Sequence, residues 1–402
     1  MRSLTVHLHR WAGLATALFL AVAGLTGTLL AFKNELEATL NPALFSVAPP
    51  GGRAEGDMLD PFVLREQLQR LHPEARADHM SFPSAGKSVM FYLMPRTDPS
   101  SGQAYPLEHD QIFVNPYSGE ALGQRRWGEL FTAGRFNREN IIPFVWRLHE
   151  ALALPHPWGK LFMGVIALIW TIDCFIGLCL TFPRGRPFLQ KWRPAWQIKR
   201  GASAYRLNLD VHRAAGLWLW IVLLVFAWSS VMLNLKEIVY QPVMSLAFEF
   251  RNERPPRLPE PRWTPALDWR QAHGMAQKAL QSLAQQQGFE VEAEDSLWYR
   301  PAQGAYMYRA RTSLDIRDEG GGTELWIDGD TGQLLKSQQE GRAASGDTLS
   351  TWLRFLHTGQ VFGITYRIAV GIVGVVVAIL SVTGVVIWWV KRKSRKASAR
   401  RA

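Results

Sequence analysis

The chain has 402 residues, a formal net charge of +11 and an apolar fraction of 48%. This length allows two or three domains. A basic balance is typical of nucleic-acid-binding proteins, but here the excess lies in two acid-free segments beside apolar stretches, 183–209 and 391–402, and at Arg2 and Arg10. The charge therefore flanks a membrane, and nucleic acid is excluded as a partner.

Four segments are long and apolar enough to cross a lipid bilayer, which takes roughly 20 residues. In chain order they are 11–32, 161–182, 214–235 and 367–390. Because basic residues gather on the cytoplasmic side of membrane proteins, the charged segments predict a multi-pass protein of a bacterial inner membrane, with both termini cytoplasmic. The two large polar segments are then periplasmic.

These features divide the chain into eight predicted segments. In order they are span 1, outward (1–32), periplasmic domain 1 (33–145), a periplasmic histidine segment with span 2, inward (146–182), a basic cytoplasmic loop (183–209), span 3, outward (210–235), periplasmic domain 2 (236–350), a second periplasmic histidine segment with span 4, inward (351–390), and a basic cytoplasmic tail (391–402).

The chain is an internal duplication. Three pairs of segments match: HRWAGL (9–14) with HRAAGL (212–217), WRLHEAL (146–152) with LRFLHTG (353–359), and IFVNPYSGEALG (112–123) with LWIDGDTGQLL (325–335). Each half has two spans, so the halves are predicted to be parallel repeats about an axis along the membrane normal. Because the first span matches the third, we expect it to be retained and not cleaved as a signal peptide.

Each periplasmic segment is predicted to be a small α+β domain. In the first, Pro61–Leu71 is expected to be a helix, with strands near 88–94 and 111–115. In the second, Trp269–Gln287 is the expected helix, and the expected strands are 297–308, 323–327 and 333–336. The predicted fold is therefore an α-helical integral membrane protein, a four-span bundle of two parallel repeats that each carry one such domain.

The repeat sorts four histidines into two equivalent pairs. His9 and His212 lie at the cytoplasmic mouths of spans 1 and 3, whereas His149 and His357 lie near the periplasmic mouths of spans 2 and 4. Two facing imidazoles on bundle helices can hold a haem iron from both sides, so the sequence predicts one haem near each membrane face. Interfacial polar histidines are the alternative. Zinc or copper is disfavoured, because Cys or carboxylate ligands at metal spacing do not accompany the histidines.

Other polar residues near the spans have two interpretations each. Arg10 and Arg213 follow the cytoplasmic histidines and either bind haem propionates or anchor the helices. Asp173 lies inside a span, where a carboxylate either moves protons or hydrogen-bonds a neighbouring helix. His7 and His156 lack counterparts in the repeat and are expected to be surface residues, with His156 as an alternative ligand. Four histidines of the soluble segments are predicted to be structural: His72, His79, His109 and His273.

Four stretches resemble the PepSY-associated transmembrane family: HRWAGL…GLTGTLLAF, RLHEALALPHPWG…IGLCLTFPR, HRAAGLWLW and FLHTGQVFG…VTGVVIWW. VNPYSGEAL and IDGDTGQLL are similar to the strand–turn–strand of PepSY domains. The resemblance covers nearly the whole chain and is strongest to ferric-siderophore reductases of the ferrioxamine reductase kind. It implies two b-type haems as cofactors, with the iron ligands His9 and His212 at the cytoplasmic face and His149 and His357 at the periplasmic face.

The resemblance also implies an oxidoreductase that passes electrons outward across the membrane, reduces a ferric siderophore in the periplasm and releases Fe(II). No G-x-G-x-x-G dinucleotide fingerprint is present, so a quinol or a cytoplasmic reductase is the expected electron donor. One alternative is a haem-bearing subunit that serves another periplasmic oxidoreductase. A siderophore transporter is a further alternative, but four spans are few for one and polar residues within the spans are scarce apart from Asp173. A non-enzymatic protease-regulatory membrane protein is another, but it does not explain the paired histidines.

Overall fold

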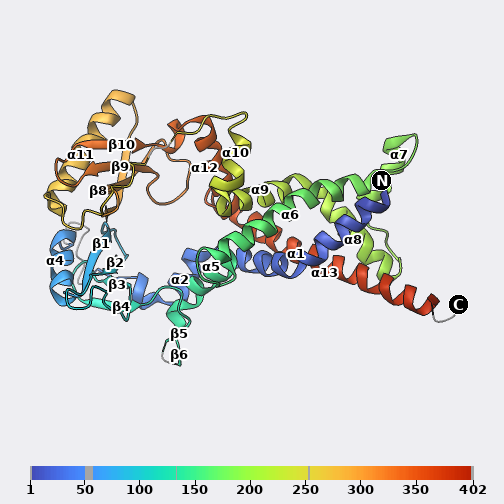
Figure 1. Cartoon of the computed structure of the whole chain (residues 1–402), viewed down its shortest axis with the longest axis horizontal. Helices are drawn as coiled ribbons and strands as arrows, with labels where there is room; N and C mark the ends of the chain where they lie inside the picture. The colour runs from blue at the N-terminus through green and yellow to red at the C-terminus, as the bar shows by residue number, and fades with distance from the viewer. Residues whose placement is uncertain (1, 50–57, 133, 252–253, 400–402) are drawn as a thin grey trace. The chain divides into compact units, whose positions relative to one another are not determined.

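A computed structural model describes residues 2–49, 58–132, 134–251 and 254–399 (Figure 1). The chain forms two compact units. The helical unit contains Met1–Phe32, Val145–Phe248 and Trp352–Ala402, and the sheet unit contains Lys33–Phe144 and Glu249–Thr351. Arg400 and Arg401 of the predicted basic tail lie outside the described residues.

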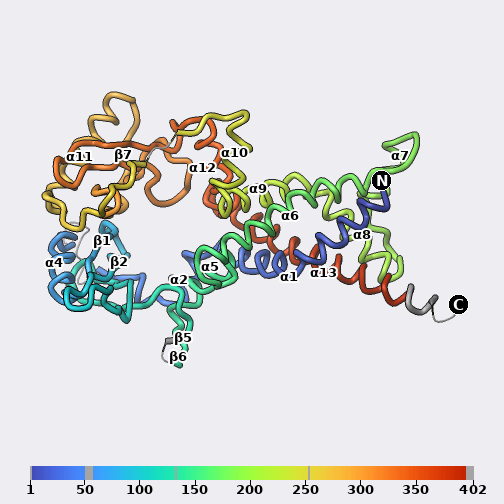
Figure 2. The backbone as a smooth tube through the Cα atoms, in the orientation of Figure 1, coloured from blue at the N-terminus to red at the C-terminus, as the bar shows by residue number. Residues whose placement is uncertain are grey.

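Three helices of the helical unit are long and apolar enough to cross a membrane, as the sequence predicts. They are α1 (Arg2–Leu30), α6 (Trp158–Thr181) and α13 (Gly363–Ala399). α1 packs against both others (Figure 2). Its contact with α13 is close, since a Cβ at Gly24 would lie 2.4 Å from the Gly374 carbonyl oxygen, and Thr28 Oγ1 donates to Gly371 O at 2.9 Å. Small residues allow such tight crossings in membranes.

The fourth candidate span is a pair of helices bent by 72°. They are α8 (Ala204–Trp218) and α9 (Trp220–Asn234). The span predicted for 214–235 is thus divided between two helices. The tryptophans on either side of the break bind different segments through their indole N–H groups. Trp218 Nε1 donates to Trp196 O at 3.1 Å, whereas Trp220 Nε1 donates to Cys174 O on α6 at 2.9 Å.

Short helices flank the long ones. α5 (Ile141–Ala151) precedes α6, and α12 (Ser345–Thr358) precedes α13. These two helices carry the second pair of predicted ligand histidines. The other short helical elements are α2 (Lys33–Leu40), α3 (Pro42–Phe45), η3 (Arg138–Asn140), α7 (Phe188–Trp192), η4 (Arg193–Trp196), η5 (Lys236–Tyr240), α10 (Gln241–Met244) and η6 (Glu340–Arg342).

The sheet unit contains one eight-stranded antiparallel sheet in the order β10–β9–β8–β7–β1–β2–β3–β4. The strands are β1 (Ala75–Ser81), β2 (Val89–Pro95), β3 (Gln111–Val114), β4 (Ala121–Arg125), β7 (Val291–Arg300), β8 (Ala305–Thr312), β9 (Thr323–Asp328) and β10 (Leu334–Gln338). A separate hairpin consists of β5 (Phe131–Thr132) and β6 (Arg135–Phe136). Helices α4 (Pro61–Leu71) and α11 (Trp269–Gln287) have the predicted bounds and pack on the large sheet through one continuous core.

The seam between β1 and β7 joins the two predicted domains in the middle of the sheet. The opposed residues are His79 with Trp298, Met80 with Leu297, and Ser81 with Ser296. The sequence predicts two separate small domains, and the structure corrects this. Left apart, β1 and β7 would each expose a row of unpaired backbone groups, and pairing them satisfies both edges. Each side of the seam contributes one helix followed by four strands.

The single strand predicted over 297–308 is also wrong. Two strands, β7 and β8, occupy this region, and the chain reverses between them. Pro301 has no N–H to continue a ladder, and Gly304 has a φ of +59°, which glycine adopts without strain. The strands expected near 88–94, 111–115, 323–327 and 333–336 are present as β2, β3, β9 and β10.

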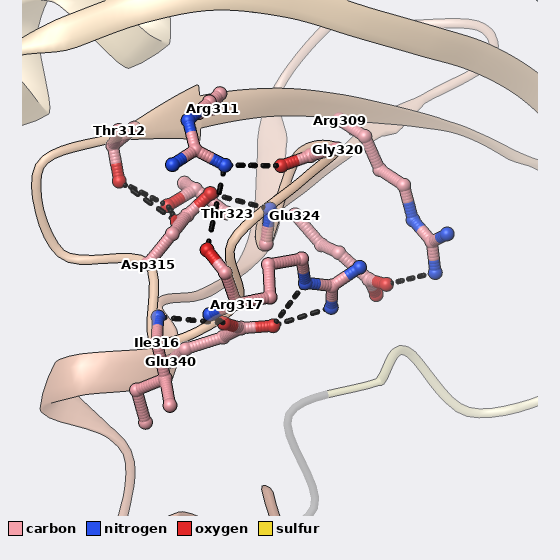
Figure 3. Close-up of polar contacts among 11 residues, drawn as sticks. Arg309, Arg311, Thr312, Asp315, Ile316, Arg317, Gly320, Thr323, Glu324 and Glu340 are labelled. Atoms are coloured by element: carbon pink, nitrogen blue, oxygen red, sulfur yellow. Dashed lines mark hydrogen bonds and ion pairs between the residues drawn. The ribbon is translucent and has the colours of Figure 1, made fainter. Parts of the chain in front are cut away.

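A polar network fixes the glycine-rich turn that follows β8 (Figure 3). Glu340 accepts a hydrogen bond from the Ile316 N–H at 3.0 Å and forms an ion pair with Arg317. Asp315 accepts from the Gly322 N–H at 2.7 Å. The charges of this cluster pair with one another and with backbone groups, so they shape the turn and do not form a ligand site.

Candidate functional site

Four histidines of the helical unit lie in two facing pairs. His9 on α1 faces His212 on α8, with ring centroids 6.2 Å apart and planes inclined by 58°. His149 on α5 faces His357 on α12, again at 6.2 Å, with an inclination of 61°. The structure thus brings together the same partners that the repeat pairs in the sequence.

The two pairs lie far apart along α1. His9 stands near the start of this helix, and Gly27, eighteen residues later, contacts the ring of His149. At a rise of 1.5 Å per residue this separation is about 27 Å, close to the ~30 Å thickness of the hydrocarbon core of a bilayer. A helix that spans a membrane would therefore bring one pair to each face.

The first pair is held through the Nδ1 atoms of its rings. His9 Nδ1 lies 2.9 Å from Asp173 Oδ1 on α6. His212 Nδ1 lies 3.1 Å from Leu380 O and 2.9 Å from Thr383 Oγ1, both on α13. Carboxylates and carbonyls only accept hydrogen bonds, so Nδ1 carries the proton on both rings.

The second pair is held in the same way by α1 and α9. His149 Nδ1 lies 3.0 Å from both Ala23 O and Thr26 Oγ1. His357 Nδ1 lies 2.8 Å from Ser229 Oγ. The Ser229 hydroxyl donates its own proton to a helix carbonyl, Phe226 O, at 3.0 Å. It therefore accepts from His357, and Nδ1 carries the proton here too.

Each ring consequently presents an unprotonated Nε2. No hydrogen bond to the Nε2 atom of any of these four histidines occurs among the residues that the structure describes. A neutral imidazole whose Nδ1–H is fixed by a neighbouring acceptor is the usual form of a metal-bound histidine, because that bond sets the tautomer and the ring orientation. The arrangement can hold a metal between the rings of each pair.

Glycines lie against three of the four rings. A Cβ at Gly27 would be 3.0 Å from His149 Cε1, one at Gly384 would be 3.3 Å from His212 Cε1, and one at Gly177 would be 3.5 Å from His9 Cε1. The first two distances are tighter than ordinary van der Waals contact. These glycines leave each imidazole the room for its observed position.

A family model described as the PepSY-associated TM region matches residues 6–391. The chain belongs to this family. No curated protein shows significant similarity to the sequence. As the family's description indicates, the apolar helices of the helical unit are membrane-embedded.

The two arginines beside His9 and His212 differ in this PepSY-associated protein. Arg213 Nη2 donates to the buried Asp210 at 2.9 Å and to Pro194 O at 2.8 Å. Asp210 also forms an ion pair with Arg206. Arg10 is half-buried and has no hydrogen bond to a described residue. A ligand carboxylate would therefore compete with Asp210 for Arg213, whereas Arg10 is open to it.

Of the remaining candidates, one contacts the first histidine pair and two are exposed. Asp173 contacts His9, so the carboxylate that the sequence marks as unusual touches a candidate ligand. His7 is exposed, and its Nδ1 lies 2.7 Å from Ser3 O. His156 is exposed in the turn between α5 and α6.

The hydroxyl partners Thr26 and Ser229 are the site residues that the sequence analysis misses. Each lies seventeen residues after the paired histidine of its own span, His9 or His212. Equivalent hydroxyls inside two apolar spans are a signal that alignment of the two halves could have revealed. Thr383 has no such counterpart, because Asp173 holds the equivalent ring in the other half.

Proposed function

We propose that this protein is a two-haem electron-transfer protein of a bacterial inner membrane, with one haem between His9 and His212 and another between His149 and His357. One observation carries the proposal: four histidines form two facing pairs, and all four keep Nδ1 protonated and Nε2 open. An interfacial histidine needs neither a partner ring nor a fixed tautomer.

The spacing of the rings fits a metal that both rings bind. Two imidazoles on opposite sides of one metal, with bonds of roughly 2 Å and ring centres about 1 Å beyond the bonding nitrogens, have centroids about 6 Å apart. The observed separation is 6.2 Å in both pairs. The donor set also favours haem. The described residues hold no group of three or more His, Cys, Asp or Glu that could bind a metal, and a haem needs only two protein ligands.

When bound, each haem would supply an iron that can change between the ferric and ferrous states. The chain's own residues hold and orient the ligands. Asp173, Leu380 O and Thr383 fix the rings at one end of the bundle, and Thr26 and Ser229 fix those at the other. No nucleophile or general acid is needed, because one-electron transfer makes and breaks no covalent bond in the protein.

Reduction of a ferric siderophore in the periplasm, with release of Fe(II), is the activity that we propose. It is supported by the four histidine-containing motifs that resemble ferric-siderophore reductases and by the basic segments that orient both termini toward the cytoplasm. The electrons come from a donor at the His9–His212 end and leave at the His149–His357 end. A second candidate function, electron delivery to another periplasmic oxidoreductase, involves the same electron transfer across the membrane and differs only in the acceptor. A protease-regulatory role does not account for the histidine pairs.

A haem assay tests the proposal. In detergent-purified protein, the pyridine haemochrome spectrum is expected to show two b-type haems per chain. His9→Ala and His357→Ala are each expected to remove about half of the haem, while His156→Ala, at an exposed histidine outside the pairs, keeps both. Protein without haem, or haem that survives both substitutions, would contradict the proposal.

The acceptor is tested separately. Dithionite-reduced protein, freed of excess reductant, is mixed with a ferric hydroxamate siderophore. Reoxidation of the haems with stoichiometric appearance of Fe(II), trapped by a ferrous chelator, is expected. If the haems stay reduced, the ferric siderophore is not the acceptor, and another periplasmic acceptor replaces it in the proposal.

A further inference from the structure

A groove runs along the surface of the helical unit between α1 and α6. Its volume is about 300 Å³, at the lower end of the usual range for small-ligand sites. Trp11 and Leu8 on α1 form one wall, and Ile169, Ile172 and Ile176 on α6 form the other. Trp11 is 62% exposed and Ile172 is 54% exposed. Because both helices are candidate spans, the groove faces lipid.

Two polar side chains also line this apolar groove, Asp173 and His7. Asp173 Oδ1 accepts the hydrogen bond of His9, and its Oδ2 has no hydrogen-bond partner among the described residues. His7 binds Ser3 O through Nδ1, which leaves Nε2 without a described partner. The groove therefore combines two apolar walls, two polar atoms that are open to a ligand, and a contact through Asp173 to the candidate iron ligand His9.

We infer that this groove binds the headgroup of a membrane quinol and is the site where electrons enter the protein. The inference rests on the proposed function and names its donor. A quinol dissolves in the bilayer, presents a flat apolar ring to Trp11 and the isoleucines, and carries hydroxyl groups that can donate to Asp173 Oδ2 and His7 Nε2.

The composition of the groove disfavours two other occupants. A reduced nucleotide carries phosphates, which need Lys, Arg or a helix N-terminus, and neither Lys nor Arg lines the groove. A lipid acyl chain could occupy the apolar walls, but it would leave Oδ2 of Asp173 without a hydrogen-bond donor in the membrane, which is costly. A hydroxyl-bearing aromatic ring satisfies both parts of the groove.

The reaction balances without a further co-reactant. The quinol loses two O–H bonds and becomes the quinone. Its two protons pass to water at that membrane face, and its two electrons leave one at a time toward the His9–His212 pair. Two ferric ions outside are each reduced by one electron. Contact between Asp173 and His9 keeps the path from the ring to the ligand short.

Ile172→Trp tests the site, because the larger side chain fills the groove from a lipid-facing position. Val165→Trp is the matched control. Val165 lies two turns earlier on α6, is 51% exposed and does not line the groove. In stopped-flow mixing of the haem-loaded protein with duroquinol, the wild type and Val165→Trp are expected to be reduced at similar rates, and Ile172→Trp at least tenfold more slowly. Reduction by dithionite and reoxidation by a ferric siderophore are expected to be the same in all three.

Three results would overturn the inference. Ile172→Trp could be reduced by duroquinol at the wild-type rate. The wild type could resist duroquinol while its dithionite-reduced form still reduces the siderophore, which would leave the proposed function standing. A photoreactive azidoquinone, used with wild-type protein, could label helices other than α1 and α6. Protein without haem would instead overturn the inference and the proposed function together.

Discussion

The histidines of the helices and the buried histidine of the sheet have different surroundings. His79 on β1 is only 4% exposed. Its ring lies 4.0 Å from the ring of Trp298 and 5.3 Å from that of Tyr92, and its Nδ1 has no hydrogen-bond partner in the part of the chain that the structure describes. The four helix histidines are less buried, yet each has an acceptor on Nδ1 and a second imidazole in front of it.

This difference teaches that burial does not distinguish a candidate ligand histidine. His79 fills space between aromatic rings, where a neutral imidazole acts as a packing group. The helix histidines are oriented by neighbours that fix one nitrogen and leave the other open. Substitutions should therefore be chosen to disturb or to keep two features, the hydrogen bond that fixes Nδ1 and the open Nε2 that has a second imidazole in front of it.

The largest effect is expected from Gly27→Val, because the added side chain would displace the ring of His149 from its position opposite His357. A Cβ at Gly27 would lie 3.0 Å from His149 Cε1, whereas one at Gly13 on the same helix meets nothing within 4 Å. We expect Gly27→Val to lose about half of the haem and Gly13→Val to keep it, as measured by pyridine haemochrome. Equal haem content in both variants would mean that His149 is not a ligand.

Removal of the hydroxyl partners should have a smaller effect, and an unequal one. His357 loses its described Nδ1 partner in Ser229→Ala, whereas His149 keeps Ala23 O in Thr26→Ala. Loss of such a partner typically costs about 10–100-fold in metal affinity. We expect haem transfer to apomyoglobin to be about tenfold faster from Ser229→Ala than from Thr26→Ala. Equal rates in these matched variants would contradict a role for the hydroxyls in holding the rings.

Substitution of His79 is expected to change the pH dependence of stability and to leave the haem content unchanged. Burial, with a contribution from Arg300 and Arg309, lowers the pKa of His79 to about 3. In the unfolded chain, with a pKa of about 6.5, the ring binds a proton that the folded sheet excludes. Stability is therefore complete above about pH 6.5 and falls as the pH drops toward 3, by about 2 kcal/mol at pH 5.

The measurement is chemical denaturation of the sheet unit in the full protein, followed by tryptophan fluorescence at pH 7 and pH 5. We expect His79→Leu to retain both haems and to flatten the difference between the two pH values by this amount. A pH dependence that is the same in His79→Leu and in the wild type would show that other groups cause it.

The smallest effect is expected within the first pair. Asp173→Asn keeps an oxygen acceptor for His9 Nδ1–H but removes the negative charge that would make the ring a stronger donor to the iron of the proposed haem. We expect the reduction potential of one haem to rise by on the order of 60 mV, which is a tenfold change for one electron, while the other haem stays unchanged. A mediated spectroelectrochemical titration measures both, and a common shift of the two haems would contradict the assignment.

The sequence predicts much of the site because the duplication supplies the information that periodicity lacks. Alignment of the two halves groups His9 with His212 and His149 with His357, and the structure places these rings opposite each other. Helices α4 and α11 are also predicted residue for residue from the helical pattern of their sequences, and in the structure Asp60 and Asp268 cap their N-termini. Local signals of this kind need no tertiary context.

Features that depend on distant contacts were not predictable. The strand ARADHMS, β1, has no clear alternation, and a bulge between Ala77 and His79 shifts its register. Its partner β7 lies more than 200 residues later. The bend between α8 and α9 has no local signal either, and the indole N–H groups of Trp218 and Trp220 beside it bind acceptors on other segments.

The seam between β1 and β7 affects how such a chain assembles. A chain with only α4 and β1–β4 would present β1 as an open edge, and two copies would meet along it as a twofold dimer whose population depends on concentration. Because one polypeptide carries both copies, the same joint forms within a molecule at a fixed effective concentration. Dilution cannot separate the two copies, even when few molecules are present in a membrane.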